Sequence, residues 1–350
     1  MPESTTANPG TINRESWNND ITLLEPQQFP YTSTVAKTGE AIGMSLETFT
    51  DRLDRPRLGG AREGGASGQG SNKLKDIKRH GAHQNFKQRQ WAVTHHQQII
   101  AGKGGLAGVT SAVARSRAHA DIELKRDMEA INCSNQDTQA GSGGSADMLT
   151  RGAVKWMTPV GTALGTAGNI GYVDPAAQTT LASVIYHGNA AAPLFSESQL
   201  NGLLKELATI RGKADSFDGI FGYNVVETLD MFSRIASPTV TVNPNQAQFY
   251  TTRQGADEHT LELMVNIYKT SFGMLNSIPS VFVNLDDTTG LGDPNAGLVL
   301  DLDLWANDVL ENMHEAEYYK RATEEGGVVQ ATWINLCGQP RGNGLIKAAA

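Results

Sequence analysis

The chain has 350 residues, a length that suits two or more lobes, and its 37 glycines predict long irregular connections. Its two cysteines, Cys133 and Cys337, lie in no CxxC pattern, which argues against a disulfide framework or a zinc site and favours a reducing compartment such as the cytoplasm. The polar N-terminus predicts no signal peptide, and the lack of any run of about 18 apolar residues predicts no membrane span.

The net charge of −8 is distributed unevenly along the chain. Residues 51–90 contain ten Lys or Arg and four Asp or Glu, which leaves +6 in this segment and −14 in the other 310 residues. Such a separation indicates that the basic segment meets an acidic surface. That surface can be nucleic acid or another copy of the chain.

Residues 1–36 are polar, contain four prolines and carry no sustained helical or alternating pattern. We expect them to form an extended N-terminal arm that lies on another surface.

A long β-hairpin is predicted over residues 37–97. Its two strands are expected at 40–50, where apolar residues alternate loosely, and at Phe86–Thr94, and both are rich in polar residues. Between them, residues 56–72 read PRLGGAREGGASGQGSN, with six glycines and one large apolar residue. An enzyme lid, a phosphate-binding loop, a linker and the tip of an arm that reaches another subunit all fit such a segment. Because an isolated hairpin is marginally stable in water, this one needs a neighbouring surface.

The clearest helix is predicted from Thr110 to Ser134. At roughly 25 residues it would be about 37 Å long, and Gly-rich residues 138–146 follow it. One side of this helix carries apolar residues at intervals of three, four or seven positions: Val113, Ala120, Leu124, Met128 and Ile131.

A mixed α/β lobe is predicted after the long helix. A capping-box pattern at Ser196 and Gln199 begins a helix that Gly212 ends, and a buried strand, FDGIFG, separates it from a helix over Tyr223–Ile235. Later strands are predicted at 261–267, 277–284, 297–305 and 328–337. This order of elements predicts an α+β fold.

Motifs for nucleotide binding and for hydrolysis are absent. The chain has no P-loop, no HExxH and no GxSxG, and GASGQG at 65–70 lacks the strand and the amphipathic helix of a dinucleotide site. The pairs His80/His83 and His95/His96 would diverge on strands, which disfavours a metal site.

Two further candidates for chemistry have simpler explanations. Asp301 and Asp303 would share one face of a predicted strand, where they could bind calcium or act in acid–base chemistry, but solvated strand residues are the preferred interpretation. Cys133, near the apolar face of the long helix, is interpreted as a buried structural thiol. We therefore expect no catalytic residue, no metal site and no cofactor.

The basic segment 73–91 also contains Phe86 and Trp91, a mixture that suits binding of single-stranded nucleic acid. Docking of a basic arm on an acidic sister subunit explains both halves of the charge pattern, so we prefer it. The acidic surface would be provided by Asp121, Glu123, Glu129 or the acids of 311–325.

Several strings resemble, in order, one branch of the tailed-bacteriophage major capsid proteins of the HK97-like fold, and the resemblance runs from about residue 15 to residue 346. They are QNFKQRQWAVTH (84–95), IELKRDMEAI (122–131), FSESQLNGLLKEL (195–207), IYKTSFGML (267–275) and the stretch from LVLDLDLW to GNGLI (298–346). The sequence departs from the family in a hairpin tip that is longer and richer in glycine.

The resemblance implies a division of the chain into named parts. These are an N-terminal arm (1–36), an extended β-hairpin or E-loop (37–97, tip 56–72), a peripheral domain (98–150) with a spine helix (110–134), a mainly axial domain (151–295) and a return through the peripheral domain (296–350). Some members cross-link a Lys to an Asn between subunits, but neither partner can be matched here.

The function implied is that of a major capsid protein, not an enzyme, which forms the hexamers and pentamers of an icosahedral head around double-stranded DNA. The DNA would touch the inner face without sequence specificity, and the resemblance leaves room for separate scaffolding, portal and decoration proteins. The chain would reside in the virion, and in the host cytoplasm during assembly. Contacts between subunits would involve the basic residues Arg52, Arg55, Arg57, Arg62, Lys73, Lys75, Lys78 and Arg79. Two alternatives stay open, a shell of an encapsulin-like nanocompartment and a nucleic-acid-binding protein that uses residues 73–91.

Overall fold

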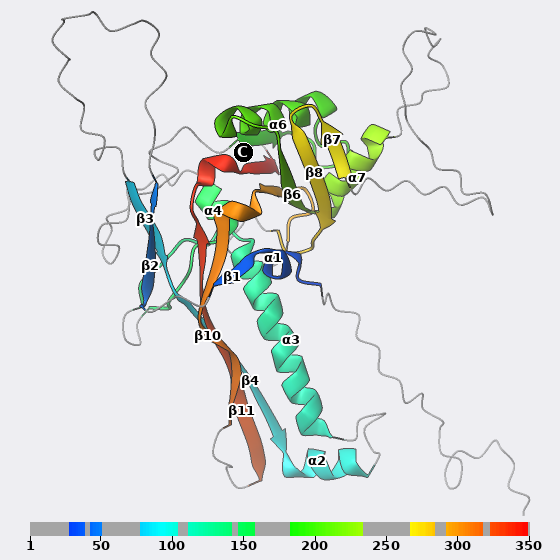
Figure 1. Ribbon diagram of the computed structural model, residues 1–350. Helices are drawn as coiled ribbons and strands as arrows, with labels where there is room; N and C mark the ends of the chain where they lie inside the picture. The colour runs from blue at the N-terminus through cyan, green and yellow to red at the C-terminus, as the bar shows by residue number, and fades with distance from the viewer. Residues whose placement is uncertain are drawn as a thin grey trace, which may run out of the picture. The chain divides into compact units, whose positions relative to one another are not determined.

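The computed structural model describes residues 28–38, 43–50, 78–103, 111–141, 146–157, 183–233, 267–283, 292–317 and 323–348 (Figure 1). These residues belong to two compact units. The first unit comprises residues 88–124 and 314–330, and the second comprises residues 28–87, 125–313 and 331–350.

A six-stranded mixed sheet lies in the second unit, with the strand order β5–β12–β9–β6–β8–β7. Its strands are β5 (Ser183–His187), β6 (Asp215–Phe221), β7 (Ile267–Thr270), β8 (Gly273–Pro279), β9 (Gly297–Leu300) and β12 (Gly344–Ala348). The pairs β5–β12 and β6–β8 are parallel, and the other three are antiparallel.

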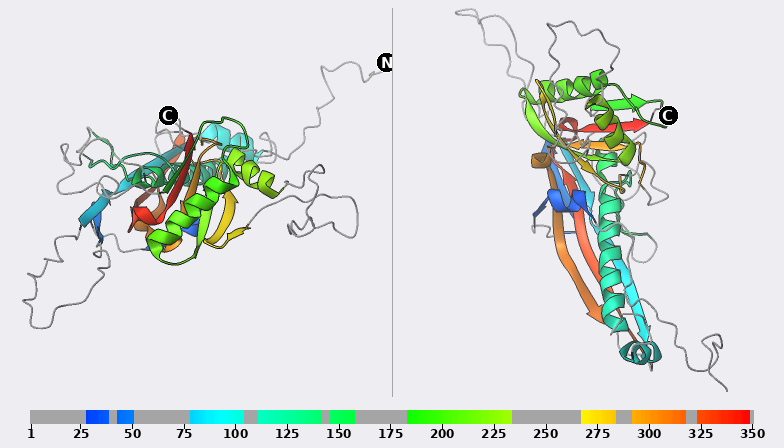
Figure 2. Two further views of the ribbon diagram at one scale, coloured as in Figure 1. Left: turned by 90° about the horizontal axis from the view of Figure 1, so that it is seen from above. Right: turned by 90° about the vertical axis from the view of Figure 1, so that its right-hand side faces the viewer.

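Both faces of this sheet are buried, because successive side chains of a strand point to opposite sides. Phe217 and Phe221 of β6 belong to one hydrophobic cluster with α6 (Glu197–Arg211) and α7 (Tyr223–Ser233), whereas Ile220 belongs to another. Figure 2 shows α6 lying over the strands of the sheet.

The sequence correctly places both ends of α6. Ser196 and Gln199 form the predicted capping box, and Gly212 adopts φ of 73°, the left-handed conformation that glycine takes readily after a helix. Four leucines of α6 are buried against the sheet: Leu200, Leu203, Leu204 and Leu207.

The opposite face of the sheet contributes to a second cluster. Tyr31 of α1 (Pro30–Thr34) and Trp156 of α4 (Ala153–Met157) are fully buried in this cluster, together with Trp305 and Ile334.

A four-stranded sheet has the order β1–β10–β11–β4. Its strands are β1 (Ala36–Thr38), β4 (Asn85–Thr94), β10 (Trp305–Glu317) and β11 (Glu324–Cys337), and β1 runs parallel to β10. The remaining elements are α2 (His95–Gly102), α3 (Ala112–Asn132) and the short 3-10 helices η2 (Leu302–Leu304) and η3 (Pro340–Gly342). The long helix predicted at 110–134 is α3.

The predicted hairpin pairs differently from expectation. β2 (Ser45–Thr50) pairs in antiparallel register with β3 (Lys78–His83), from Ser45 opposite His83 to Thr50 opposite Lys78, and β4 joins the four-stranded sheet instead. The sequence of β3, KRHGAH, has no apolar alternation, so its periodicity carried no strand signal. The tip at 56–72 and the predicted strand at 261–266 lie outside the described residues.

Two other strand predictions also need correction. The strand predicted at 297–305 ends at Leu300, where Asp301 caps the η2 turn. The strand predicted at 277–284 overlaps β8 only at 277–279, because β8 begins at Gly273 and ends at Pro279. His95 and His96 begin α2 rather than ending a strand. Among the described helices, none has the length and apolar character that crossing a membrane requires.

Candidate functional site

The ribbon formed by β2 and β3 is fixed to the second unit at one end. Ala82 is fully buried, and Leu46 packs against the same core cluster. The backbone N–H of Gln84 donates to the Met44 carbonyl at 3.0 Å, and that of His83 donates to Thr138 Oγ1 at 2.8 Å.

Two large apolar side chains on this part of the chain are exposed. Met44 is 63% exposed and Phe49 is 68% exposed. Phe49 lies opposite Arg79, one residue from the end of the ribbon that leads to the glycine-rich tip. An exposed aromatic side chain on a two-stranded ribbon marks a surface suited to contact with another chain.

The structure places two of the eight predicted contact residues. Lys78 and Arg79 belong to β3, where they pair with Thr50 and Phe49. The other six lie outside the described residues: Arg52, Arg55, Arg57, Arg62, Lys73 and Lys75. Their contacts stay a prediction.

One of the acids suggested as a partner for the basic segment has a different role. Glu129 is fully buried, and its carboxylate accepts hydrogen bonds from the backbone N–H groups of Tyr31 at 2.6 Å and Thr32 at 2.8 Å, and from Thr32 Oγ1 at 2.5 Å. Burial raises the pKa of Glu129, although these hydrogen bonds oppose the shift. Glu129 therefore anchors the chain's own α1 and is not an acceptor for a neighbour.

A buried polar network surrounds this anchor, and sequence reasoning missed it. Tyr31 donates its hydroxyl to Asn335 Oδ1 at 2.8 Å. The amide of Asn335 donates to the Arg151 carbonyl at 3.2 Å, and its backbone N–H donates to Thr150 Oγ1 at 3.0 Å. An asparagine within a predicted strand gives no signal of such a role.

The acidic pair considered for chemistry is divided by the fold. Asp301 is buried and forms an ion pair with Arg211, which also contacts Asp215 at 2.6 Å. Burial raises the pKa of Asp301, and hydrogen bonding to Lys213 lowers that of Asp215. The backbone N–H of Asp303 donates a hydrogen bond to Asp301 Oδ1 at 3.3 Å within the η2 turn. The prediction that the two acids share a strand face is wrong, because β9 ends before them. The carboxylate of Asp301 is paired with Arg211.

The surroundings of the two thiols are those of structural, unreactive side chains. Cys133, which follows the last residue of α3, and Cys337 are both buried and free, and burial raises the pKa of each. This agrees with the interpretation of Cys133 as a buried thiol. Within the described ranges, no three His, Cys, Asp or Glu side chains gather to hold a metal ion.

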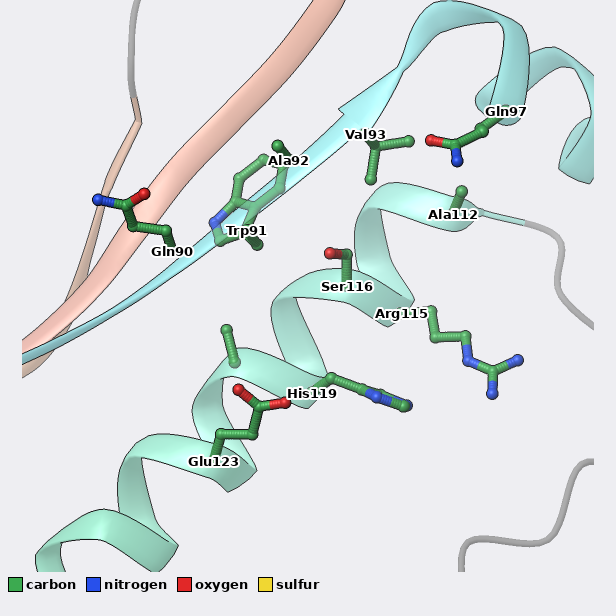
Figure 3. A pocket seen from close by; sticks show the side chains of 11 residues that line it. Gln90, Trp91, Ala92, Val93, Gln97, Ala112, Arg115, Ser116, His119 and Glu123 are labelled. Atoms are coloured by element: carbon green, nitrogen blue, oxygen red, sulfur yellow. The ribbon is translucent and has the colours of Figure 1, made fainter.

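The first unit has a hollow of about 400 Å³ between β4 and the first half of α3 (Figure 3). Trp91 and Val93 come from β4, and Ser116 and Ala120 come from α3. Beside it, Arg117 lies over the Trp91 ring at 4.7 Å and pairs with Glu315 at 3.0 Å.

The model of the SU10 major capsid protein family matches residues 4–350. The chain belongs to the SU10 major capsid protein family. It is a phage shell protein, as the sequence resemblance predicted, and the match does not favour the nanocompartment or nucleic-acid alternatives. No curated protein matches the chain.

Solved structures resemble this SU10-family protein over nearly its whole length. The capsid asymmetric unit of Cyanophage A-1(L) has a TM-score of 0.68 at 11% identity, and the match covers 98% of this chain and 99% of that one. The capsid of a native GTA particle has a TM-score of 0.57 at 11% identity, with both chains fully covered. A chain of Gordonia phage Cozz has a TM-score of 0.55 at 13% identity, with 100% and 98% covered. These matches confirm the predicted HK97-like α+β fold.

Proposed function

We propose that this SU10-family protein forms the hexamers and pentamers of an icosahedral head around double-stranded DNA, and that the β2–β3 ribbon with its tip reaches neighbouring subunits. The observation that carries the proposal is Phe49, which is exposed near the far end of a ribbon whose base is fixed by Ala82. A closed symmetric assembly gives each such surface a partner.

Electrostatic attraction supports the same arrangement. The eight basic residues from Arg52 to Arg79 would face acidic surfaces of a neighbour. The candidate acids are Asp121, Glu123 and those of 311–325, because Glu129 is buried within its own chain. An exposed ion pair contributes about 0–1 kcal/mol, so assembly would depend on many such pairs in each subunit.

The named parts of the fold family are assigned as part of this proposal. The E-loop would be the β2–β3 ribbon with its connection, the spine helix would be α3, and the axial domain would contain the six-stranded sheet. β4 would then belong to the peripheral domain and not to the E-loop, so the E-loop would be shorter than the range 37–97 predicted from the sequence.

A role in the shell also implies where the protein assembles, what it contacts and which other chains it requires. It would assemble in the host cytoplasm, perform no chemistry and bind no cofactor. Its inner face would touch packaged DNA without reading the sequence, and portal, scaffolding and decoration proteins would be separate chains.

Deletion of residues 56–72 tests the role of the ribbon tip. Electron microscopy of the purified wild-type protein should show closed particles tens of nanometres across, on the order expected for many copies of a domain of this size. The deletion should abolish them while leaving the circular dichroism spectrum and thermal unfolding of the subunit unchanged. A variant in which residues 56–72 are replaced by a Gly-Ser segment of equal length separates sequence from length. Normal particles from the deletion variant would contradict the proposal.

A further inference from the structure

The hollow between β4 and α3 has an apolar floor. Trp91 and Val93 of β4 are 4% and 5% exposed, and Ala120 of α3 is 4% exposed. Ser116, one turn earlier in α3, also lines it, so small side chains of the helix leave space beside the indole.

The Arg115 guanidinium brings a positive charge to the edge of this floor. Arg115 and His119 line the hollow, and Figure 3 shows them projecting to the same side from consecutive turns of α3. Neither forms an ion pair with another residue in the part of the chain that the structure describes. The acid at the end of the hollow, Glu123, lies 3.9 Å from Arg89. The site therefore suits a peptide that combines apolar side chains with carboxylates.

We propose that the hollow is a docking site for an acidic peptide segment, and that residues 20–25 of this chain, DITLLE, are that segment. Asp20 and Glu25 flank the apolar residues Ile21, Leu23 and Leu24. The apolar side chains would cover Trp91 and Ala120, and a carboxylate would face Arg115. This contact lies within one chain, so it goes beyond the assembly role proposed above and can fail independently of it.

The segment can reach the hollow from where the described chain begins. The backbone N–H of Tyr31 is fixed to Glu129, which follows Ala120 by nine residues in the same helix, or about 14 Å at 1.5 Å per residue. Leu24 precedes Tyr31 by seven residues, which span up to about 25 Å when extended. The connection is therefore long enough without movement of the anchor.

Cysteine cross-linking in the full-length protein tests the placement. The double variant Leu23→Cys with Ser116→Cys should form a disulfide within one chain about tenfold faster than the control Thr6→Cys with Ser116→Cys, because docking raises the local concentration of the thiol. Mass spectrometry of the digested protein identifies the linked peptides. The native Cys133 and Cys337 are buried and contribute little background.

A charge exchange tests the chemistry of the contact. Arg115→Glu should slow formation of the Leu23→Cys/Ser116→Cys disulfide, and adding Asp20→Arg to Arg115→Glu should restore it. Circular dichroism checks that each variant is folded. Equal rates for the position 23 and position 6 variants would overturn the proposal, as would disulfides formed only between chains, which would assign the hollow to a second copy. Failure of the charge exchange to restore the rate would overturn the part assigned to Arg115.

Discussion

Glu129 caps α1 through Tyr31, whose backbone N–H lies 2.6 Å from the Glu129 carboxylate. α1 has five residues and no side-chain N-cap of its own. Its first residue, Pro30, has no N–H to satisfy, and the next two N–H groups, those of Tyr31 and Thr32, both donate to Glu129. A residue 98 positions away thus replaces the local cap, and a buried carboxylate attaches α1 to α3.

Glu129→Ala should destabilise the unassembled subunit by about 2–4 kcal/mol, because it leaves the buried N–H of Tyr31 and the partly buried N–H of Thr32 without an acceptor. Urea unfolding measures the difference. Glu123→Ala is the matched control on the same helix, because Glu123 is exposed and its ion pair with Arg89 is long, so the change should stay within about 0.5 kcal/mol. Equal effects of the two substitutions would contradict the cap.

The stability contributed by Glu129 should depend on pH in a defined direction. Burial raises its pKa above the ordinary value of 4.5, so the folded protein holds this proton more tightly than the unfolded chain does. The contribution is fully present below the unfolded pKa and is lost as pH rises through the folded pKa. The free energy of unfolding of the wild type, relative to Glu129→Gln, should therefore fall as the pH rises above about 4.5, the ordinary pKa of the carboxyl. A relative stability that rises with pH over this range would contradict the direction of the shift.

Local sequence signals predicted local structure well. The capping box of Ser196, the αL cap at Gly212 and the position of α3 depend on neighbours within a few residues, and all three lie where they were expected. The HK97-like fold came from the order of several strings, which no single pattern of periodicity could supply.

Long-range pairing was beyond local signals. β10, with the sequence WANDVLENMHEAE, has many residues that favour helices and no regular alternation, and it is a strand because β11 pairs beside it. The sequence suggested that Glu129 is one of several exposed acids on the long helix. Only the tertiary fold brings Tyr31 close to it. The hollow beside Trp91 likewise depends on two elements that are separate in sequence.

Two glycines offer a test of packing with opposite expected signs. A Cβ at Gly327 would lie 2.9 Å from the Ala316 carbonyl oxygen and 2.9 Å from Trp91 Nε1, so Gly327→Ala should destabilise by about 1–3 kcal/mol. A Cβ at Gly202, inside α6, would meet nothing within 4 Å, and Gly202→Ala should stabilise by about 0.5–1 kcal/mol. Thermal unfolding of the two variants beside the wild type measures both. Stabilisation by Gly327→Ala would show that Trp91 does not pack closely on β11.

Phe49 should matter for assembly and not for the stability of the subunit. Because its side chain is 68% exposed, Phe49→Asp should change the free energy of unfolding by no more than about 0.5 kcal/mol. The same change places a charge where a neighbouring subunit would cover the ring, so light scattering should show slower assembly and fewer particles. Phe49→Tyr keeps the aromatic surface and is the matched control, with assembly close to that of the wild type. Unchanged assembly of Phe49→Asp would show that this side chain is not part of an interface, and the contacts of the ribbon would then have to come from its basic tip alone.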